Sequence, residues 1–304
     1  MILHILGSAA GGGFPQWNCH CSNCAGVRAG TVRASRRTQS SIAVSEDGTD
    51  WLLINASPDI LHQVAATPAL RPARALRDSA ICAVLLMDAQ IDHVAGLLML
   101  RERTAPLPLY VTDQVYADLT HGLPLANVLT HYCGVERHRV HADGQPFAVA
   151  PLLHTAFRAV PLDGKAPPYS PHRNDPHAGD NIGLTITSHH SGRSAFYAPG
   201  LASLTDGVLS AMRQADVLLV DGTFWSDDEM IAQGLSTKTA AALGHLPQSG
   251  PGGMIALLER MPARRKILIH INNSNPILRE DSAERALLTQ YGIEVAADGM
   301  EIVF

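Results

Sequence analysis

Three cysteines near the start of the chain have the spacing of a metal site. Cys19, Cys21 and Cys24 fall within six residues, which is too close for a normal disulfide framework. In a reducing compartment such a cluster more often binds metal, and soft thiolate sulfur selects zinc. The alternative is a set of incidental or redox-active cysteines. A structural zinc needs a fourth ligand, which the pattern leaves open between the neighbouring His20 and a distant His or Asn.

An acid and an imidazole follow the apolar stretch 80–87. Asp92 and His93 are adjacent, shortly after Asp88 ends the apolar run. Strand-to-helix turns project side chains beyond the edge of a sheet, and open α/β sheets bind ligands there. The alternative is that Asp92 only caps the following helix and that His93 is exposed in its first turn.

A second apolar stretch also ends in a histidine. His270 follows it and precedes a polar turn, 272–275, that contains Asn273. A lone histidine at such a position is more often a core residue, but two strands that end alike favour a functional site for both. Asp221 also ends an apolar stretch, and three roles are open to it: a ligand, a partner of a ligand, or a turn residue. His245 begins a turn rich in Gly and Pro.

The elements that must position these residues alternate along the chain. Apolar and β-branched runs predict strands at 2–6, 40–45, 51–55, 80–87, 107–111, 145–152, 181–187, 194–198, 216–221, 266–271, 293–296 and 300–304. Helical patterns occupy 92–103, 112–123, 203–215, 227–236, 250–261 and 281–292, the last with Gly292 as its stop. This alternation predicts sheets covered by helices, an α/β layered architecture.

Segment 163–180 interrupts the pattern. Its prolines and glycines exclude regular structure, and a loop of this length is typical of a lid or a substrate-binding segment. Elsewhere the chain has no obvious linker and no internal repeat. We therefore expect one domain over 1–304, with an N-terminal zinc loop at about 11–30.

Composition excludes several classes of protein. The 304 residues are 46% hydrophobic and 17% charged, which suits a globular core. The net charge of −5, without a dense basic patch, argues against nucleic acid as a partner and favours small molecules or peptides. No apolar run approaches the roughly 18 residues that span a bilayer, and no signal peptide is evident. We expect a cytoplasmic protein.

With acids and histidines at its strand ends, the chain resembles the metallo-β-lactamase superfamily. The hallmark of that superfamily is His-x-His-x-Asp-His after a buried strand. The aligned stretch here is Asp88-Ala89-Gln90-Ile91-Asp92-His93, which keeps the last two ligands and lacks the first two. Together with the cysteine cluster, further segments resemble the pyrroloquinoline quinone (PQQ) biosynthesis protein B family over nearly the whole chain. These segments are "NASPDI" (55–60), "APPYSPHR" (166–173), "GDNIGL" (179–184), "GHLPQSG" (244–250) and "HINNSNPIL" (270–278).

This resemblance implies a four-layer αββα sandwich, a structural zinc at the cysteines, a homodimer and a role in PQQ biosynthesis. Within that role it implies Fe(II)- and O2-dependent hydroxylation of the tyrosine ring of a Glu-Tyr precursor. The alternative is a soluble carrier that transports PQQ or its precursor. A third option is a metallohydrolase, because the phosphodiesterase branch of the superfamily shares such a cysteine cluster.

The remaining ligand types favour the hydroxylase. Asp92, His93 and His270 supply one carboxylate and two imidazoles, the set that holds non-haem Fe(II) with open positions for oxygen and substrate. The absence of both hallmark histidines is expected to cripple the two-metal centre of hydrolytic members. The same ligands also accept other divalent metals.

Other residues complete the predicted site. Asp221 is a fourth ligand or a proton acceptor, and His245 is a general acid or base. Asn273 supplies an oxygen or amide contact there.

Residues in the Pro-rich loop are candidates for binding substrate. Arg173 and His172 are candidates to pair with a carboxylate, and Tyr169 is a candidate to stack on the phenol. The alternative for all three is an ordinary exposed loop.

Overall fold

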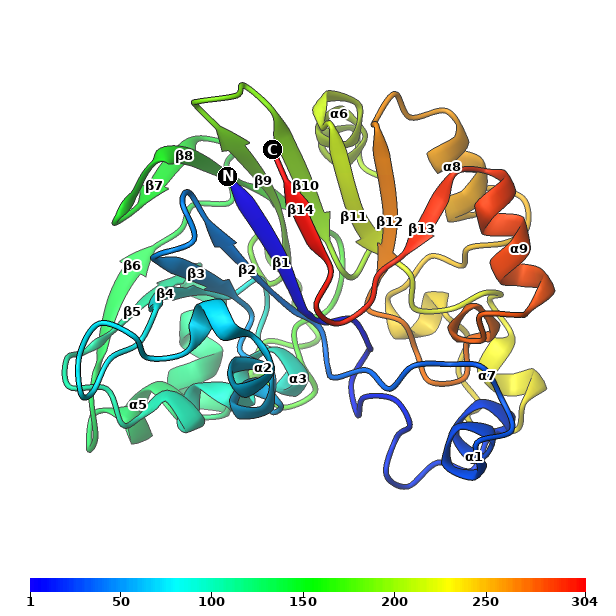
Figure 1. Ribbon diagram of the computed structural model, residues 1–304, viewed down its shortest axis with the longest axis horizontal. Coiled ribbons are helices and arrows are strands. Elements are labelled where there is room, and N and C mark those ends of the chain that lie inside the picture. The colour runs from blue at the N-terminus through cyan, green and yellow to red at the C-terminus, as the bar shows by residue number, and fades with distance from the viewer.

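Two seven-stranded sheets form the centre of the computed structural model, which describes residues 1–304 (Figure 1). The first sheet has the order β14-β1-β2-β3-β4-β5-β6, and the second has the order β13-β12-β11-β10-β9-β8-β7. The strands of the first sheet are β1 (Ile2–Gly7), β2 (Ser41–Ser45), β3 (Trp51–Ile54), β4 (Ile81–Leu85), β5 (Leu107–Val111), β6 (Val135–Arg139) and β14 (Glu301–Val303). Those of the second are β7 (Pro146–Val149), β8 (Leu152–Pro161), β9 (Ile182–Ser188), β10 (Ser194–Ala198), β11 (Val217–Asp221), β12 (Arg265–Ile269) and β13 (Ile293–Val295).

Each sheet is antiparallel on one side and parallel on the other. In the first sheet β14, β1, β2 and β3 pair antiparallel, whereas β3 to β6 pair parallel. The second sheet repeats this division, with β10 to β13 parallel. Ligand sites in open sheets lie beyond the carboxyl ends of parallel strands. The turns after β4, β11 and β12 are therefore the positions to search for a site.

Short helices connect the strands. They are α1 (Ser22–Ala29), α2 (Ile60–Ala66), α3 (Ile91–Val94), α4 (Asp113–Ala117), α5 (Leu125–Leu129), α6 (Asp206–Gln214), α7 (Glu229–Ala232), α8 (Met254–Glu259) and α9 (Ala283–Gln290). Local sequence sets several of their ends. The Ser282 hydroxyl accepts a hydrogen bond from Arg285 N (3.0 Å) at the start of α9, and Gly292 takes a left-handed conformation (φ 64°) after its end.

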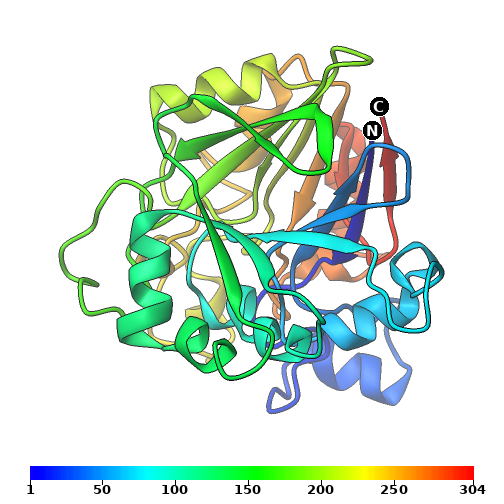
Figure 2. The same ribbon diagram turned by 90° about the vertical axis from the view of Figure 1, so that its left-hand side faces the viewer.

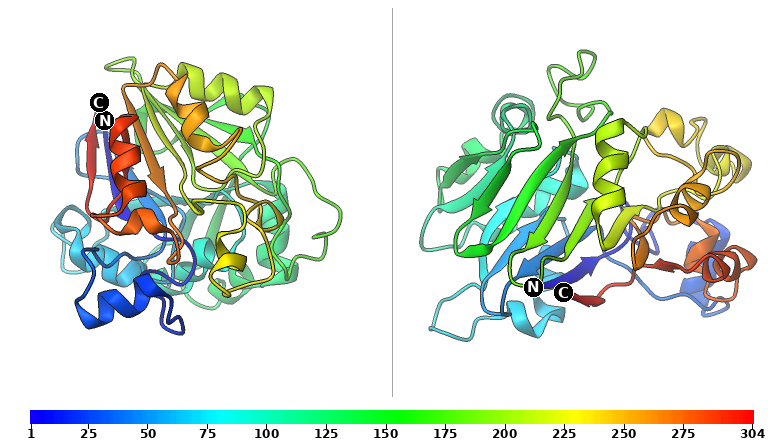
Figure 3. Two further views of the ribbon diagram at one scale, coloured as in Figure 1. Left: turned by 90° about the vertical axis from the view of Figure 1, so that its right-hand side faces the viewer. Right: turned by 90° about the horizontal axis from the view of Figure 1, so that it is seen from above.

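Three apolar layers hold the molecule together. One layer, with Ile5, Leu85 and Leu219, lies between the two sheets. A second packs the first sheet against α4, α5 and the segment that follows α3, and a third packs the second sheet against α6, α8 and α9. Figure 2 shows the helices of the first sheet, and the left view of Figure 3 shows α6, α8 and α9 on the outside of the second. The predicted αββα sandwich is confirmed.

All twelve predicted strands overlap strands of the structure, but the prediction of one continuous strand over 145–152 was wrong. Val149 pairs with Leu152 across a tight turn, so this segment is the end of β7 and the beginning of a hairpin with β8. The exposed edge strand β6 was not predicted, because its sequence VERHR is mostly charged and lacks an apolar run. No helix of the structure is both long and apolar enough to cross a membrane.

The predicted helix 92–103 is also shorter than expected. After α3 the chain continues as a 3-10 helix over Ala95–Leu100. Gly96 lies so close to the backbone after β3 that an added Cβ would lie 2.1 Å from Ser57 O. Gln90 is the N-cap residue of α3 and no side chain caps it, so the interpretation of Asp92 as a helix cap was wrong.

Candidate metal and catalytic site

Asp92, His93 and His270 converge from the two sheets. His93 and Asp92 follow β4, and His270 follows β12. Asp92 Oδ2 lies 3.4 Å from His270 Nε2 and 3.8 Å from His93 Nε2, and one potential ligand atom of each residue lies within 4.8 Å of the others. The structure therefore brings together the one carboxylate and two imidazoles that the sequence indicated.

Asp88 orients the ring of His93. His93 Nδ1 donates to both carboxylate oxygens of Asp88, at 2.8 and 2.9 Å. This bond leaves Nε2 as the nitrogen with the lone pair, and Nε2 is buried without a hydrogen-bond partner. A buried imidazole nitrogen with no partner, pointing toward a carboxylate and a second imidazole, fits a metal ligand held by an outer carboxylate.

Thr223 orients His270 in the same way. The Thr223 hydroxyl donates to His270 O (2.9 Å), so it accepts from His270 Nδ1 (3.0 Å). His270 Nε2 is therefore free to act as a ligand. His270 is one of only two non-glycine residues with positive φ, at 61°. Such a conformation costs on the order of 1–3 kcal/mol and is retained mainly at functional positions.

His245 lies beside this cluster, and Asp221 supports it. Asp221 Oδ2 accepts from His245 Nδ1 (2.8 Å) and Leu201 N (2.8 Å), while Oδ1 accepts from Thr223 N (2.9 Å). The carboxylate is fully buried and both oxygens have partners. This arrangement does not favour Asp221 as a fourth metal ligand, and makes it the residue that positions His245. The rings of His245 and His270 stack at 5.5 Å.

Charge at the site favours a bound cation. Burial opposes protonation of His93, but the carboxylates of Asp88 and Asp92 raise its pKa to about 9. Burial likewise opposes ionisation of Asp92, yet His93 and His270 lower the pKa of Asp92. In the metal-free protein a proton therefore supplies the positive charge that these carboxylates attract, and a metal ion would replace it.

A cavity of about 770 Å³ opens over these side chains. Asp92, His93, His245 and His270 are among the residues that line it. The other charged lining residues include the cations Lys165, Arg173 and Lys238 and the acids Asp88 and Asp163. The cavity therefore has a metal-ligand cluster and several cationic groups in its wall.

Two of the predicted substrate residues lie outside this cavity wall. The Tyr169 hydroxyl donates to Ala89 O and its ring packs with the apolar layer beside the first sheet. His172 Nε2 lies 2.8 Å from Asp180 Oδ1. Neither residue is placed to contact a ligand in the cavity, whereas Arg173 lines it.

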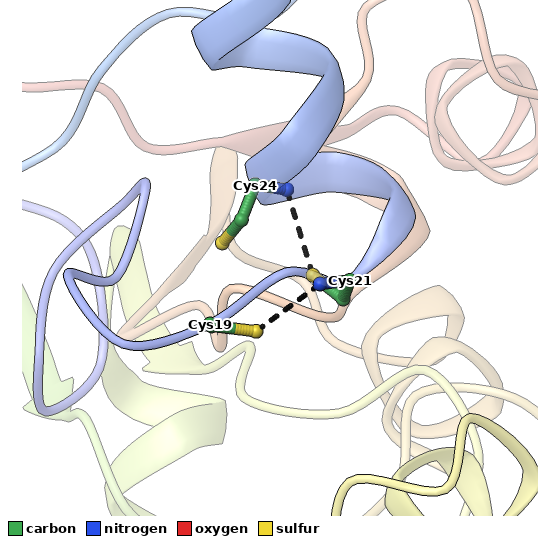
Figure 4. Close-up of side chains that lie close together, drawn as sticks. All are labelled: Cys19, Cys21 and Cys24. Atoms are coloured by element: carbon green, nitrogen blue, oxygen red, sulfur yellow. Dashed lines mark hydrogen bonds between the residues drawn. The ribbon is translucent and has the colours of Figure 1, made fainter.

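The cysteine cluster is a separate site at the start of α1 (Figure 4). Cys21 Sγ accepts from Cys24 N (3.5 Å) and Cys19 Sγ accepts from Cys21 N (3.4 Å), so the thiols turn inward. All three are free cysteines. Burial raises the pKa of Cys24 to about 11. Burial favours the neutral thiols, so three thiolates at this position would need a bound cation to stabilise their charge.

Asn273 belongs to the cysteine cluster and not to the histidine site, so its predicted place was wrong. Its side-chain amide lies 3.0, 3.6 and 3.4 Å from the sulfurs of Cys19, Cys21 and Cys24. The reason is the turn after β12, which directs residue 270 into the cavity and residue 273 away from it. His20, the nearest candidate for a fourth ligand, is exposed.

Sequence reasoning missed several residues of the site. Asp88 and Thr223 orient the histidines, and Lys165 and Lys238 line the cavity. The sequence could have indicated a role for Asp88, because this residue stands at the position of the first hallmark histidine. Thr223, Lys165 and Lys238 had none, because they are common residue types in loops.

Comparisons with known proteins define the class first. Residues 50–271 match the family model described as beta-lactamase superfamily domain, in agreement with the two-sheet fold. A crystal structure of a diphosphatase from the PhnP family shares this fold, with a TM-score of 0.69, 21% identity and coverage of 100% of this chain and 96% of that chain. The chain is thus a member of the β-lactamase superfamily.

More similar relatives define the family. Coenzyme PQQ synthesis protein B of Cupriavidus taiwanensis is 65% identical over 300 residues, covering 99% of this chain and 98% of the relative. That of Methylobacillus flagellatus (strain KT) is 58% identical over 304 residues, covering 100% of both. The crystal structure of Zn(2+)-bound PqqB from Methylobacterium extorquens matches with a TM-score of 0.91, 40% identity and full coverage of both chains. The chain belongs to the coenzyme PQQ synthesis protein B family, which places it in PQQ biosynthesis.

Proposed function

We propose that this protein is a non-haem iron hydroxylase that adds oxygen to the tyrosine ring of a Glu-Tyr precursor of PQQ. The observation that carries the proposal is the buried, unpartnered Nε2 of His93, aimed at Asp92 and His270. These three residues would hold Fe(II) and leave coordination positions open toward the cavity. When bound, the iron supplies the activation of O2.

The position of Asp88 argues against a metallohydrolase. In hydrolytic members the corresponding hallmark residue is a ligand of a two-metal centre. Here both Asp88 oxygens accept from His93 Nδ1, and Oδ1 also accepts from Gln90 N (2.9 Å). The carboxylate is therefore committed to orienting a ligand. A single-metal site remains, which suits oxygen chemistry better than activation of a bridging water.

His245 is the proton-handling group of the proposed reaction. Burial opposes its protonation, but Asp221 raises the pKa of His245 above its ordinary value. Asp221 holds Nδ1, so Nε2 is the nitrogen available to take up or return the phenol proton. Insertion of one oxygen atom into a ring C–H bond, with the second leaving as water, consumes two protons and two electrons. A two-electron reductant is therefore a co-substrate.

Cationic residues of the cavity wall would bind the substrate carboxylates. Glu-Tyr carries two carboxylates, and Arg173, Lys165 and Lys238 line the cavity. Arg173 donates to Ala166 O within the same loop, which fixes the direction of its guanidinium. Arg173 is partly buried, whereas Lys165 and Lys238 are exposed, so an ion pair with Arg173 should fix the orientation of a substrate carboxylate more strongly than a pair with either lysine.

The test is oxygen uptake together with product mass. Metal-stripped protein is loaded anaerobically with Fe(II) and then given Glu-Tyr, ascorbate and O2. We expect uptake and the mass gain of one oxygen atom in the wild type and in His62→Ala, a control at an exposed helical histidine, but not in His93→Ala. Absence of both signals in the wild type would contradict the hydroxylase. Stoichiometric quinone binding that persists in His93→Ala would then support the soluble carrier.

The cysteine cluster is proposed to hold a structural zinc, with Asn273 closing the site. The Asn273 Nδ2 group faces all three sulfurs, and a half-turn of the side-chain amide would place Oδ1 there as a fourth ligand. The Zn(2+)-bound relative supports zinc as the ion.

The protein is further proposed to be a homodimer that uses the cysteine loop. Trp17 in this loop is 85% exposed, more than any other Trp, Tyr or Phe of the chain, and aromatic residues are enriched at protein interfaces. Sedimentation of Trp17→Ser is expected to give a monomer where the wild type gives a dimer. A dimer in both would exclude this surface.

A further inference from the structure

The Pro-rich loop 163–180 contains a third cluster of metal-ligand side chains. One potential ligand atom from each of His172, His177 and Asp180 lies within 4.8 Å of the others. His172 Nε2 is 2.8 Å from Asp180 Oδ1, and the rings of His172 and His177 are 5.4 Å apart and nearly perpendicular. None of the three residues lines the active-site cavity. The cluster is thus distinct from the site of Asp92, His93 and His270.

A buried carboxylate faces this cluster from the helical layer of the first sheet. Asp118 is 1% exposed, and its Oδ1 has no hydrogen-bond partner. That oxygen lies 3.8 Å from His172 Nδ1. An ion bound at His172 Nε2 would leave the proton on Nδ1, which faces Asp118. At 3.8 Å the two atoms are not hydrogen-bonded, but a small rotation of the His172 ring toward an ion would make Asp118 the outer carboxylate that ligand histidines commonly have.

The donor on the opposite side is rigid. Asp180 is 1% exposed, and its Oδ2 accepts from His177 N (2.7 Å), which leaves Oδ1 directed at His172. His177 is half exposed, so a ligand could approach from solvent. Two imidazoles and one carboxylate suit Zn²⁺ and other late first-row divalent ions, with one position left for water.

We propose that His172, His177 and Asp180 bind a divalent transition-metal ion, with Asp118 as the outer partner of His172, and that this ion clamps the loop in place. Arg173 follows His172 directly and lines the cavity, as does Lys165 in the same loop. At the other end, Thr112 Oγ1 donates to Gly179 O (2.7 Å), and Ile182 N donates to Met87 O (2.9 Å). An ion here would therefore fix the cationic wall of the cavity without contacting the reacting atoms.

The test counts bound metal and does not depend on turnover. Protein dialysed against buffered Zn²⁺ is assayed for metal per chain in the wild type, His177→Ala and the exposed control His189→Ala. We expect His177→Ala to lose one ion per chain and the control to lose none. His177 is the most exposed of the three ligands, so this substitution leaves the fold intact. Equal metal content in all three proteins would overturn the proposal.

A second experiment separates this site from the active site. In a His93→Ala/His270→Ala background with zinc at the cysteines, added Co²⁺ is expected to give a visible ligand-field spectrum without sulfur charge-transfer bands. Hydrogen exchange in 163–180 is expected to slow on the same titration. Both signals should vanish when His177→Ala is added. No Co²⁺ spectrum, or one that His177→Ala leaves unchanged, would overturn the loop site, and neither result bears on hydroxylation.

Discussion

The cysteine cluster and the Asp/His site are built in opposite ways. Cys19, Cys21 and Cys24 come from six consecutive residues, whereas Asp92, His93 and His270 come from the turns that follow strands of two different sheets. The side-chain amide of Asn273 covers the thiols, while the imidazoles face a cavity of about 770 Å³. A local, closed set suits structure, and a dispersed, open set suits chemistry, because open positions admit oxygen and substrate.

The two sites nevertheless share one turn. His270 and Asn273 are separated by two residues after β12, and they point to different clusters. Asn23 in α1 donates to Asn273 O (3.1 Å) and Asn275 O (2.9 Å), while Asn275 Nδ2 donates to Gly222 O (3.0 Å) beyond β11. These buried bonds attach the cysteine loop to the strand end that carries a proposed iron ligand. A disturbance of the cysteine cluster should therefore reach the catalytic site, but weakly.

The largest effect on activity should come from His270→Ala. Losing an outer partner of a ligand lowers activity by about 10- to 100-fold. Losing the ligand itself should lower it further, so hydroxylation should fall below detection. Zinc at the cysteines should remain at the wild-type level. Metal analysis and oxygen uptake on the same sample check both statements. Loss of both metals together would show that the two sites are one cooperative unit.

Cys24→Ser should have the largest effect on stability. Binding of structural zinc contributes several kcal/mol to folding, so the variant should lose its zinc and melt at a lower temperature. Fe(II) binding at Asp92, His93 and His270 should weaken less than tenfold. Cys133→Ser, a cysteine outside the cluster, is the control and should change neither property. If zinc-free Cys24→Ser melted at the wild-type temperature, the zinc would have no structural role.

Asp88→Asn should separate orientation from ligation. The amide keeps the shape of Asp88 but removes the charge that fixes His93 Nδ1 as a donor. We expect a loss of about 10- to 100-fold in Fe(II) affinity or activity, with no change in zinc at the cysteines. Asp47→Asn, at an exposed turn, is the control. Wild-type iron affinity in Asp88→Asn would mean that His93 needs no such partner.

The contrast between the sites also explains what could be predicted. The cysteine cluster was evident from the sequence because three cysteines within six residues must lie close together in any fold. The fold was predictable because its strands are apolar runs. Asp92, His93 and His270 were visible as polar ends of buried strands, but only the folded sheets show that Asn273 points away from His270. Lys165 and Lys238 could not be found, because their role depends on where two loops meet over a cavity.

The predicted effect most remote from the reaction concerns Glu229, next to the shared turn. Its carboxyl accepts from Ser274 Oγ and from Trp225 N (2.6 Å), and burial raises the pKa of Glu229 to about 7 from an ordinary 4.5. Between these pH values the folded protein binds more protons here than the unfolded chain does. The free energy of unfolding should therefore fall as pH rises from 4.5 to 7, by up to about 3 kcal/mol, and then level off.

Glu229→Gln should remove this dependence. The glutamine amide can accept from Trp225 N and donate to Ser274, as the protonated carboxyl does, without taking a charge into the core. Denaturant unfolding of both proteins at several pH values measures the difference, which should be near zero at pH 4.5 and largest above pH 7. Because Ser274 adjoins Asn273, zinc affinity of the wild type should also weaken across this window beyond the change in Glu229→Gln. Parallel stability curves for the two proteins would show that Glu229 is ionised in the fold at no cost, and that the shared turn does not sense pH.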